Sequence, residues 1–179
     1  MIYKELVNWL MLAEYKKITN KKKIELLHNY ENINEICSIL NLNQEEKIDK
    51  YIKYMQEKNI QVITYYDKDY PKQLKNLYDA PIAIYAIGNC KILNRKNKIA
   101  VIGARKASNY GINIARQIGS FLSKNNIHTI SGLALGIDVN SHLGVLKENS
   151  VNSTSGRAIA VIGNGLDKKL PICLAIFIP

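Results

Sequence analysis

The chain has 179 residues, a mass of 20.3 kDa and a formal net charge of +10 at pH 7, and 47% of its residues are hydrophobic. This length allows one medium domain or two small ones, and the apolar share argues against a disordered chain. No apolar run reaches the length of a membrane span, and the first ten residues are too polar for a signal peptide, so we expect a cytoplasmic protein with no membrane partner.

Residues 1–57 contain neither glycine nor proline, and their apolar side chains recur at helical spacing. This pattern predicts three or four short helices that form a small helical, SAM-like domain. The lysine run at residues 21–23 has two interpretations, a phosphate contact or a solvated helix start, and we favour the helix start.

The spacing of apolar residues changes from residue 58 onward. Alternating apolar residues predict strands at 60–66 and 82–87, with a short helix at 72–77 between them. A repeating strand–loop–helix pattern follows, and such repeats form right-handed βαβ units with a parallel sheet. The strands of this repeat are expected at 99–102, 128–130 and 158–162, and its helices at 110–124 and 139–147. The fold class is therefore α/β, with a helical domain at 1–57 and an incomplete, extended Rossmann-like parallel-sheet domain at 58–179.

The basic excess lies almost entirely in the second half of the chain. Residues 1–90 hold 13 Lys and Arg against 12 Asp and Glu, whereas residues 91–179 hold 12 against 3. A charge field polarised in this way is typical of a protein with a polyanion partner. The three cysteines are isolated in the sequence, so we expect free thiols in a reducing compartment and no metal site.

Three glycine loops follow the strands of the repeat, at residues 103–111, 131–138 and 163–167. Strands that run into glycines and then a helix build anion sites at the carboxyl edge of a parallel sheet. In the first loop, Gly103 permits a tight turn, Arg105 supplies a planar fork for phosphate oxygens and Lys106 adds a point charge. Ser108 or Asn109 is expected to cap the helix that follows, which would aim backbone N–H groups at the same anion.

In the second loop, Gly132 and Gly136 are expected to permit close approach, and Asp138 is expected to cap the next helix. His142 lies one helical turn beyond Asp138, so a proton-shuttle pair is conceivable. We favour the plainer interpretation, in which a capping aspartate stands beside an ordinary helix histidine.

Several cofactor classes are disfavoured by what these loops lack. The first loop departs from Gly-x-Gly-x-x-Gly, and the second strand ends without the acidic residue that would hold an NAD ribose. The sequence has no Walker-type Gly-Lys-Ser/Thr loop and no metal-ligand spacing. We therefore expect neither a cofactor nor a metal.

Several short motifs in order closely resemble the bacterial DNA-processing protein A family (DprA, also called Smf). The motifs are Asp69-Tyr-Pro71, Ala80-Pro81, Tyr85 with Gly88-Asn89, the loop 103–111, the loop 131–138 with His142, and residues 160–167. The resemblance implies an extended Rossmann-like domain that binds single-stranded DNA without sequence preference and has no established enzyme activity. It also implies a role in natural transformation, in which the protein protects incoming strands and helps to load the RecA recombinase.

The candidate DNA- and phosphate-binding residues all lie in the three glycine loops. They are Gly103, Arg105, Lys106, Ser108, Tyr110, Gly111, Ser131, Gly132, Gly136, Asn164 and Gly165.

The family continues beyond the third loop, whereas this chain ends in the apolar segment 170–179, so we expect a protein cut short in its Rossmann-like domain. The missing half would carry the rest of the DNA pocket and the usual dimer contacts, so an expected homodimer depends on it. Two other functions stay open at this point. One is a phosphoribohydrolase-like nucleotide enzyme, although its Pro-Gly-Gly-x-Gly-Thr loop is missing, and the other is a non-functional fragment.

Overall fold

The computed structural model describes residues 3–43, 46–151 and 155–163. Contacts between residues group the chain into two compact units, an N-terminal unit (Met1–Asn94) and a C-terminal unit (Arg95–Pro179). Each unit is described by itself.

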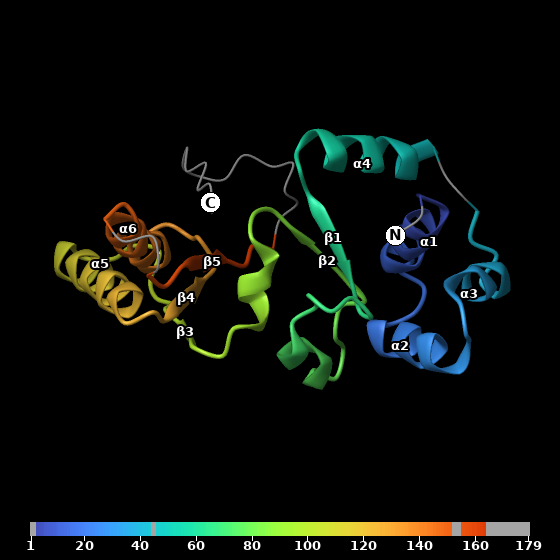
Figure 1. The fold of residues 1–179 in the computed structure, drawn as a ribbon, viewed down its shortest axis with the longest axis horizontal. Helices are drawn as coiled ribbons and strands as arrows, with labels where there is room; N and C mark the ends of the chain where they lie inside the picture. The colour runs from blue at the N-terminus through green and yellow to red at the C-terminus, as the bar shows by residue number, and fades with distance from the viewer. Residues whose placement is uncertain (1–2, 44–45, 152–154, 164–179) are drawn as a thin grey trace. The chain divides into compact units, whose positions relative to one another are not determined.

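Four helices open the N-terminal unit (Figure 1): α1 (Tyr3–Glu14), α2 (Asn20–Asn29), α3 (Ile33–Ile39) and α4 (Glu46–Glu57). Two of them begin at side-chain caps, since the Thr19 hydroxyl accepts from the Lys22 N–H and the Asn32 side chain accepts from the Glu35 N–H. The prediction of three or four short helices is confirmed.

An antiparallel pair of strands follows the helices, β1 (Gln61–Thr64) and β2 (Ala83–Ala86), in which Gln61 stands opposite Ala86. The turn after β1 is held by Asp67, whose carboxylate accepts from the Thr64 N–H at 2.7 Å and from its hydroxyl at 2.9 Å. Two 3₁₀ helices complete the unit, η1 (Lys72–Asn76) and η2 (Cys90–Asn94). Both predicted strands and the predicted short helix are present, and the strands are shorter than expected.

Apolar side chains from the helices and from the β1–β2 pair form a common core. In it, Trp9 and Leu12 of α1 share one cluster with Ile63, Tyr65 and other buried residues of the strand region. A second cluster joins α1 to α4. The division between compact units therefore falls after Asn94, whereas the sequence placed the domain boundary after residue 57.

The lysine run at the start of α2 is engaged within this unit. The buried Lys23 donates its Nζ to the Ala13 carbonyl at 2.7 Å, and Lys22 pairs with Glu25 at 2.9 Å. The Lys21 Nζ lies 4.4 Å from the centre of the Tyr78 ring. These contacts fit the interpretation of the run as a helix start, although the buried Lys23 is not solvated as that interpretation expected.

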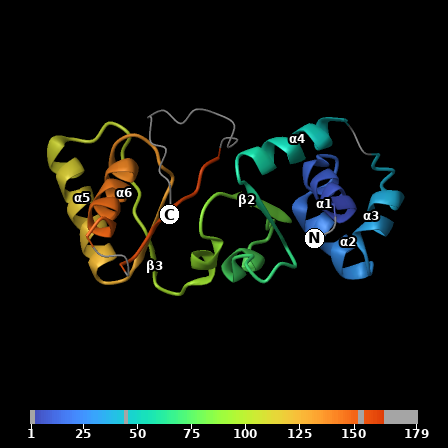
Figure 2. The same cartoon turned by 45° about the horizontal axis from the view of Figure 1, so that its top comes forward.

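The described residues of the C-terminal unit form a three-stranded parallel sheet with two helices. Its elements, in chain order, are β3 (Lys98–Ala100), α5 (Asn109–Lys124), β4 (His128–Ser131), α6 (Ile137–Asn149) and β5 (Ala158–Ala160). The strand order is β3-β4-β5, and both connections run in the same direction along the sheet, so right-handed crossovers place α5 and α6 on one face. Figures 1 and 2 show the two helices side by side. The predicted βαβ repeat is confirmed.

The two helices pack with their backbones in near contact. A Cβ atom at Gly119 would lie 2.0 Å from the Ser141 carbonyl oxygen, and one at Gly144 would lie 2.1 Å from the Arg116 carbonyl oxygen. Side-chain hydrogen bonds border this contact, with Arg116 Nε donating to Asn140 Oδ1 at 2.8 Å and Ser120 Oγ to Glu148 at 3.0 Å. Within the described part of the chain, no helix is both long and apolar enough to cross a membrane.

Candidate nucleic-acid interface

The glycine loops leave the sheet at its carboxyl edge. The first loop follows β3, the second follows β4, and residues 161–163 follow β5. The central strand is continuous with both neighbours at this edge, because the Val101 N–H donates to the Ile130 carbonyl and the Val161 N–H donates to the Ser131 carbonyl, both at 2.9 Å. The sheet therefore brings together the first two loops and the start of the third, as the strand order requires.

Asp138 joins the first two loops. One oxygen of its buried carboxylate accepts from the Gly103 N–H and the other accepts from the Gly132 N–H, each at 3.2 Å. The prediction that Asp138 caps the next helix is wrong. The N-cap of α6 is Gly136, which has no side chain to cap with, and Asp138 lies in the first turn with its carboxylate directed at the loops.

Two glycines of these loops, Gly103 and Gly136, are required by contacts inside the protein. Gly136 has a φ of 87°, and a Cβ there would lie 2.2 Å from the Ala104 carbonyl oxygen. A Cβ on Gly103 would lie 2.6 Å from Cγ1 of Ile137. Gly103 and Gly132 are among the candidate phosphate-binding residues, and their amides already donate to the carboxylate of Asp138, so these N–H groups have an acceptor inside the protein.

Leu133 is a feature of the second loop that the sequence does not reveal. Its side chain is buried and its φ is 56°, a left-handed conformation that costs a residue with a Cβ about 1 kcal/mol or more. Leucine carries no signal for this conformation, whereas glycine or asparagine would have suggested it.

The first loop presents charged and aromatic side chains to solvent. Arg105 and Lys106 are exposed, and among the described residues neither forms an ion pair with a carboxylate. Tyr110, in the first turn of α5, is 76% exposed. Of the two candidate caps, Ser108 is the one used, and its hydroxyl accepts from the Gly111 N–H at 3.2 Å.

Two further predicted positions are buried. The Ser131 hydroxyl donates to the Val101 carbonyl at 2.6 Å, so it ties β4 to the first loop's strand and does not face solvent. His142 has no exposed surface, and burial lowers its pKa below the usual 6.5, against smaller raising effects of Ser131 and Asp138. An uncharged, enclosed imidazole fits the ordinary structural histidine and not a proton shuttle to solvent. Asn164 and Gly165 lie outside the described residues.

The described residues contain no group of three or more His, Cys, Asp or Glu side chains placed to hold a metal ion. What the edge of the sheet offers a ligand is thus cationic and aromatic side chains on the first loop, at the positive end of the 16-residue helix α5. That set of groups suits a phosphate-bearing chain.

Comparison with known proteins places the chain in a family. Residues 61–174 match the family model described as DNA recombination-mediator protein A. The protein Smf of Borreliella burgdorferi is 31% identical over 184 residues, which cover 90% of this chain and 54% of the relative. The chain thus spans about half the length of that relative.

Two solved structures are similar to this one. The crystal structure of DNA processing protein A from Streptococcus pneumoniae has a TM-score of 0.64 and 23% identity, over 93% of this chain and 61% of that chain. A structure of DNA processing protein A from Helicobacter pylori, described by its single-stranded DNA binding mode, has a TM-score of 0.51 and 28% identity, over 62% and 46% of the two chains.

Proposed function

Because the chain belongs to the DNA recombination-mediator protein A family, we propose that it binds single-stranded DNA at the carboxyl edge of its parallel sheet and acts in DNA processing during natural transformation. The observation that carries the proposal is the first glycine loop, where Arg105, Lys106 and Tyr110 are exposed together at the start of α5. The single-stranded DNA binding described for the Helicobacter pylori relative supports it.

The physical roles of the three side chains differ. Arg105 and Lys106 neutralise consecutive phosphates, and the partial positive charge at the start of α5 adds to their field. Tyr110 offers a flat ring on which a base of any identity stacks, since every base has a π-face. Neither role reads a base edge, so the binding has no sequence preference.

Asp138 supports this interface from inside. Its carboxylate holds the backbone of the first and second loops together, because its two oxygens accept hydrogen bonds from the amides of Gly103 and Gly132. Asp138 is therefore a positioning residue that does not itself contact DNA.

The test is binding of a fluorescently labelled oligo-dT strand, followed by anisotropy at low salt. Arg105→Ala is expected to weaken binding about tenfold, and Tyr110→Ala by a similar factor, whereas Tyr110→Phe keeps the ring and most of the affinity. Two phosphate contacts predict a slope of log affinity against log salt of roughly −1.4 for a single strand.

Lys124→Ala is the matched control. It removes one exposed charge from the last residue of α5, at the end of that helix opposite the first loop, where Lys124 pairs with Glu148 at 3.7 Å. Binding by this variant should stay within twofold of the parent. If Arg105→Ala binds oligo-dT as tightly as Lys124→Ala does, the first loop is not the DNA site.

The finer parts of the proposal are RecA loading, self-association and the absence of catalysis. RecA loading is tested by RecA filament assembly on protein-coated single strands, compared between reactions that contain this chain and reactions that lack it. Sedimentation of the purified chain measures the second. Recovery of an intact, unmodified dT strand after incubation is the result expected for a binding protein.

A further inference from the structure

A pocket in the N-terminal unit is separate from every residue of the proposed DNA site. It has a volume of about 360 Å³ and is lined by residues of α1, α2, the connection between α2 and α3, α3 and the turn after β1. This volume falls in the range of about 300–1,000 Å³ that is typical of small-ligand sites. The lining residues that matter below are Glu5, Trp9, Tyr30, Glu31 and Tyr66.

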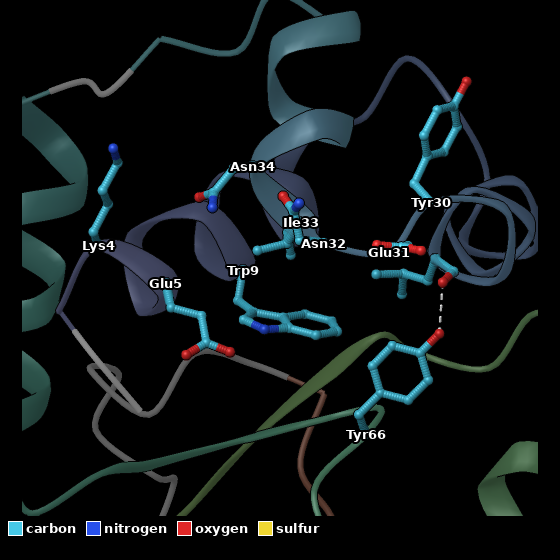
Figure 3. Close-up of a pocket in the computed structure, with 10 residues that line it drawn as sticks. Lys4, Glu5, Trp9, Tyr30, Glu31, Asn32, Ile33, Asn34 and Tyr66 are labelled. Atoms are coloured by element: carbon cyan, nitrogen blue, oxygen red, sulfur yellow. Dashed lines mark hydrogen bonds between the residues drawn. The ribbon is translucent and has the colours of Figure 1, made fainter.

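The walls of the pocket are aromatic. The indole of Trp9 is 4% exposed and belongs to the hydrophobic core, so it closes the inner side of the pocket. The Tyr66 ring, which is 53% exposed, meets the indole edge to face, with ring centres 6.1 Å apart and an angle of 82°. Tyr66 is held in place by its hydroxyl, which donates to the Leu27 carbonyl at 2.7 Å (Figure 3). Tyr30 adds a third ring, 36% exposed. The rings of Trp9 and Tyr66 are therefore held in a fixed arrangement by their mutual contact and by the Tyr66 hydrogen bond.

The charge at the pocket is negative, in contrast to the chain as a whole. Glu5 and Glu31 are exposed lining residues, and among the described residues neither forms an ion pair. Figure 3 draws the Trp9 ring between these two carboxylates. The one lining cation, Lys4, extends away from the indole in that view.

The exposed ring of Tyr66, in a pocket that two carboxylates also line, favours a cation that is flat and weakly hydrated. The arginine guanidinium has these properties, since it stacks on aromatic rings and forms paired hydrogen bonds with carboxylates. A phosphodiester chain is disfavoured here, because two carboxylates against one lysine repel it. We propose that this pocket binds an arginine side chain of a partner protein, which makes the N-terminal unit a protein-docking module distinct from the DNA site.

Trp9 is the single tryptophan of the chain, so its fluorescence reports on this pocket directly. The experiment titrates the full chain with an acetylated, amidated peptide of three Gly-Arg repeats, and with the same peptide carrying glutamine in place of arginine. The arginine peptide is expected to give a saturable change in Trp9 emission, and the glutamine peptide none.

Charge-neutral variants locate the response. Glu5→Gln and Glu31→Gln should each raise the dissociation constant of the arginine peptide about threefold. The matched control is Glu46→Gln, which removes the same charge from an α4 side chain that is 94% exposed and outside the pocket, and it should leave the constant within twofold. Circular dichroism checks that each variant is folded.

The proposal is overturned if both peptides change the emission equally, or if the double variant Glu5→Gln/Glu31→Gln binds the arginine peptide as the parent does. It is also overturned if oligo-dT gives the saturable response, which would make the pocket a nucleobase site. A response that instead depends on protein concentration alone would assign the pocket to a second copy of the chain.

Discussion

The two units of this chain reach a folded state by different means. In the N-terminal unit, helices and strands are joined by clusters of large apolar side chains around Trp9, Leu12 and Ile36. In the C-terminal unit, α5 and α6 touch through Gly119 and Gly144, and the loops are joined by the carboxylate of a buried aspartate.

The difference lies in what each unit tolerates. An apolar cluster adjusts to a change of one side chain, because neighbouring rotamers shift to fill or yield space. Backbones in contact cannot shift without moving whole helices, and a buried carboxylate has few alternative partners. The C-terminal unit, which carries the proposed DNA site, is therefore the more brittle of the two.

Gly119→Val gives the largest effect expected on this comparison. Its Cβ would lie 2.0 Å from the Ser141 carbonyl oxygen, so α5 and α6 must separate, at a cost of about 3 kcal/mol or more. Hydrogen exchange, read by mass spectrometry, should show faster exchange in both helices. Trp9 fluorescence, which reports the N-terminal unit, should show an unchanged unfolding transition.

Gly111→Ala is the matched control on the same helix. A Cβ at Gly111 would lie 3.4 Å from Cδ1 of Ile137, which is ordinary contact, and alanine is the better helix former by about 1 kcal/mol. This variant should be as stable as the parent or more so. Equal destabilisation by both substitutions would refute the idea that backbone contact sets the limit.

Asp138→Ala is expected to have the next largest effect on stability. It removes the shared acceptor of two backbone amides and should destabilise the C-terminal unit by about 2–3 kcal/mol, since hydrogen bonds to a charged group are the stronger kind. Asp138→Asn keeps one acceptor oxygen and should fall between this variant and the parent. Denaturant unfolding monitored by hydrogen exchange measures the order, and an alanine variant as stable as the asparagine variant would contradict the bridging role.

Sequence patterns predicted the elements of this chain well and the contacts between loops poorly. Period 3.6 and strand–glycine–helix repeats are local signals, so the four helices and the βαβ units were readable. The role of Asp138 was misjudged because an aspartate before a helix looks like a cap, whereas its partners, Gly103 and Gly132, lie 35 and 6 residues away. The exposure of Arg105 follows from its place in a loop, but the burial of Ser131 depends on the neighbouring strand.

Acidic pH should lower the stability of the C-terminal unit by less than these substitutions do. Burial lowers the pKa of His142 and of His128 below 6.5, with nearby cations adding to the effect at His128, whose Nδ1 accepts from the Arg157 N–H at 2.9 Å. The unfolded chain binds these protons more tightly than the folded one, so stability is present above about pH 6.5 and is lost as the pH falls below it. The slope is at most about 1.4 kcal/mol per pH unit for each histidine.

Urea unfolding at pH 7.5 and at pH 5.5 measures this effect. The exchange-detected transition of the C-terminal unit should move to lower urea at the acidic pH, and His128→Gln should reduce the movement because glutamine does not titrate. A transition that is independent of pH over this interval would show that neither histidine must stay neutral for the unit to fold.

Lys22→Ala is expected to have the smallest effect on stability, and it tests whether the lysine run at residues 21–23 contacts DNA. Among the described residues, Lys22 forms an ion pair with the neighbouring Glu25 alone, and both side chains are about half exposed. Loss of Lys22 should therefore produce no measurable shift in the Trp9-detected transition. Oligo-dT affinity should also stay within twofold, because the proposed site lies on the first glycine loop. Lys23→Ala is the contrast, since that buried amine donates to the Ala13 carbonyl and its removal should cost about 1 kcal/mol. A marked loss of DNA affinity in Lys22→Ala, with stability intact, would instead make the lysine run a second DNA contact. DNA binding would then involve both units and not the C-terminal unit alone.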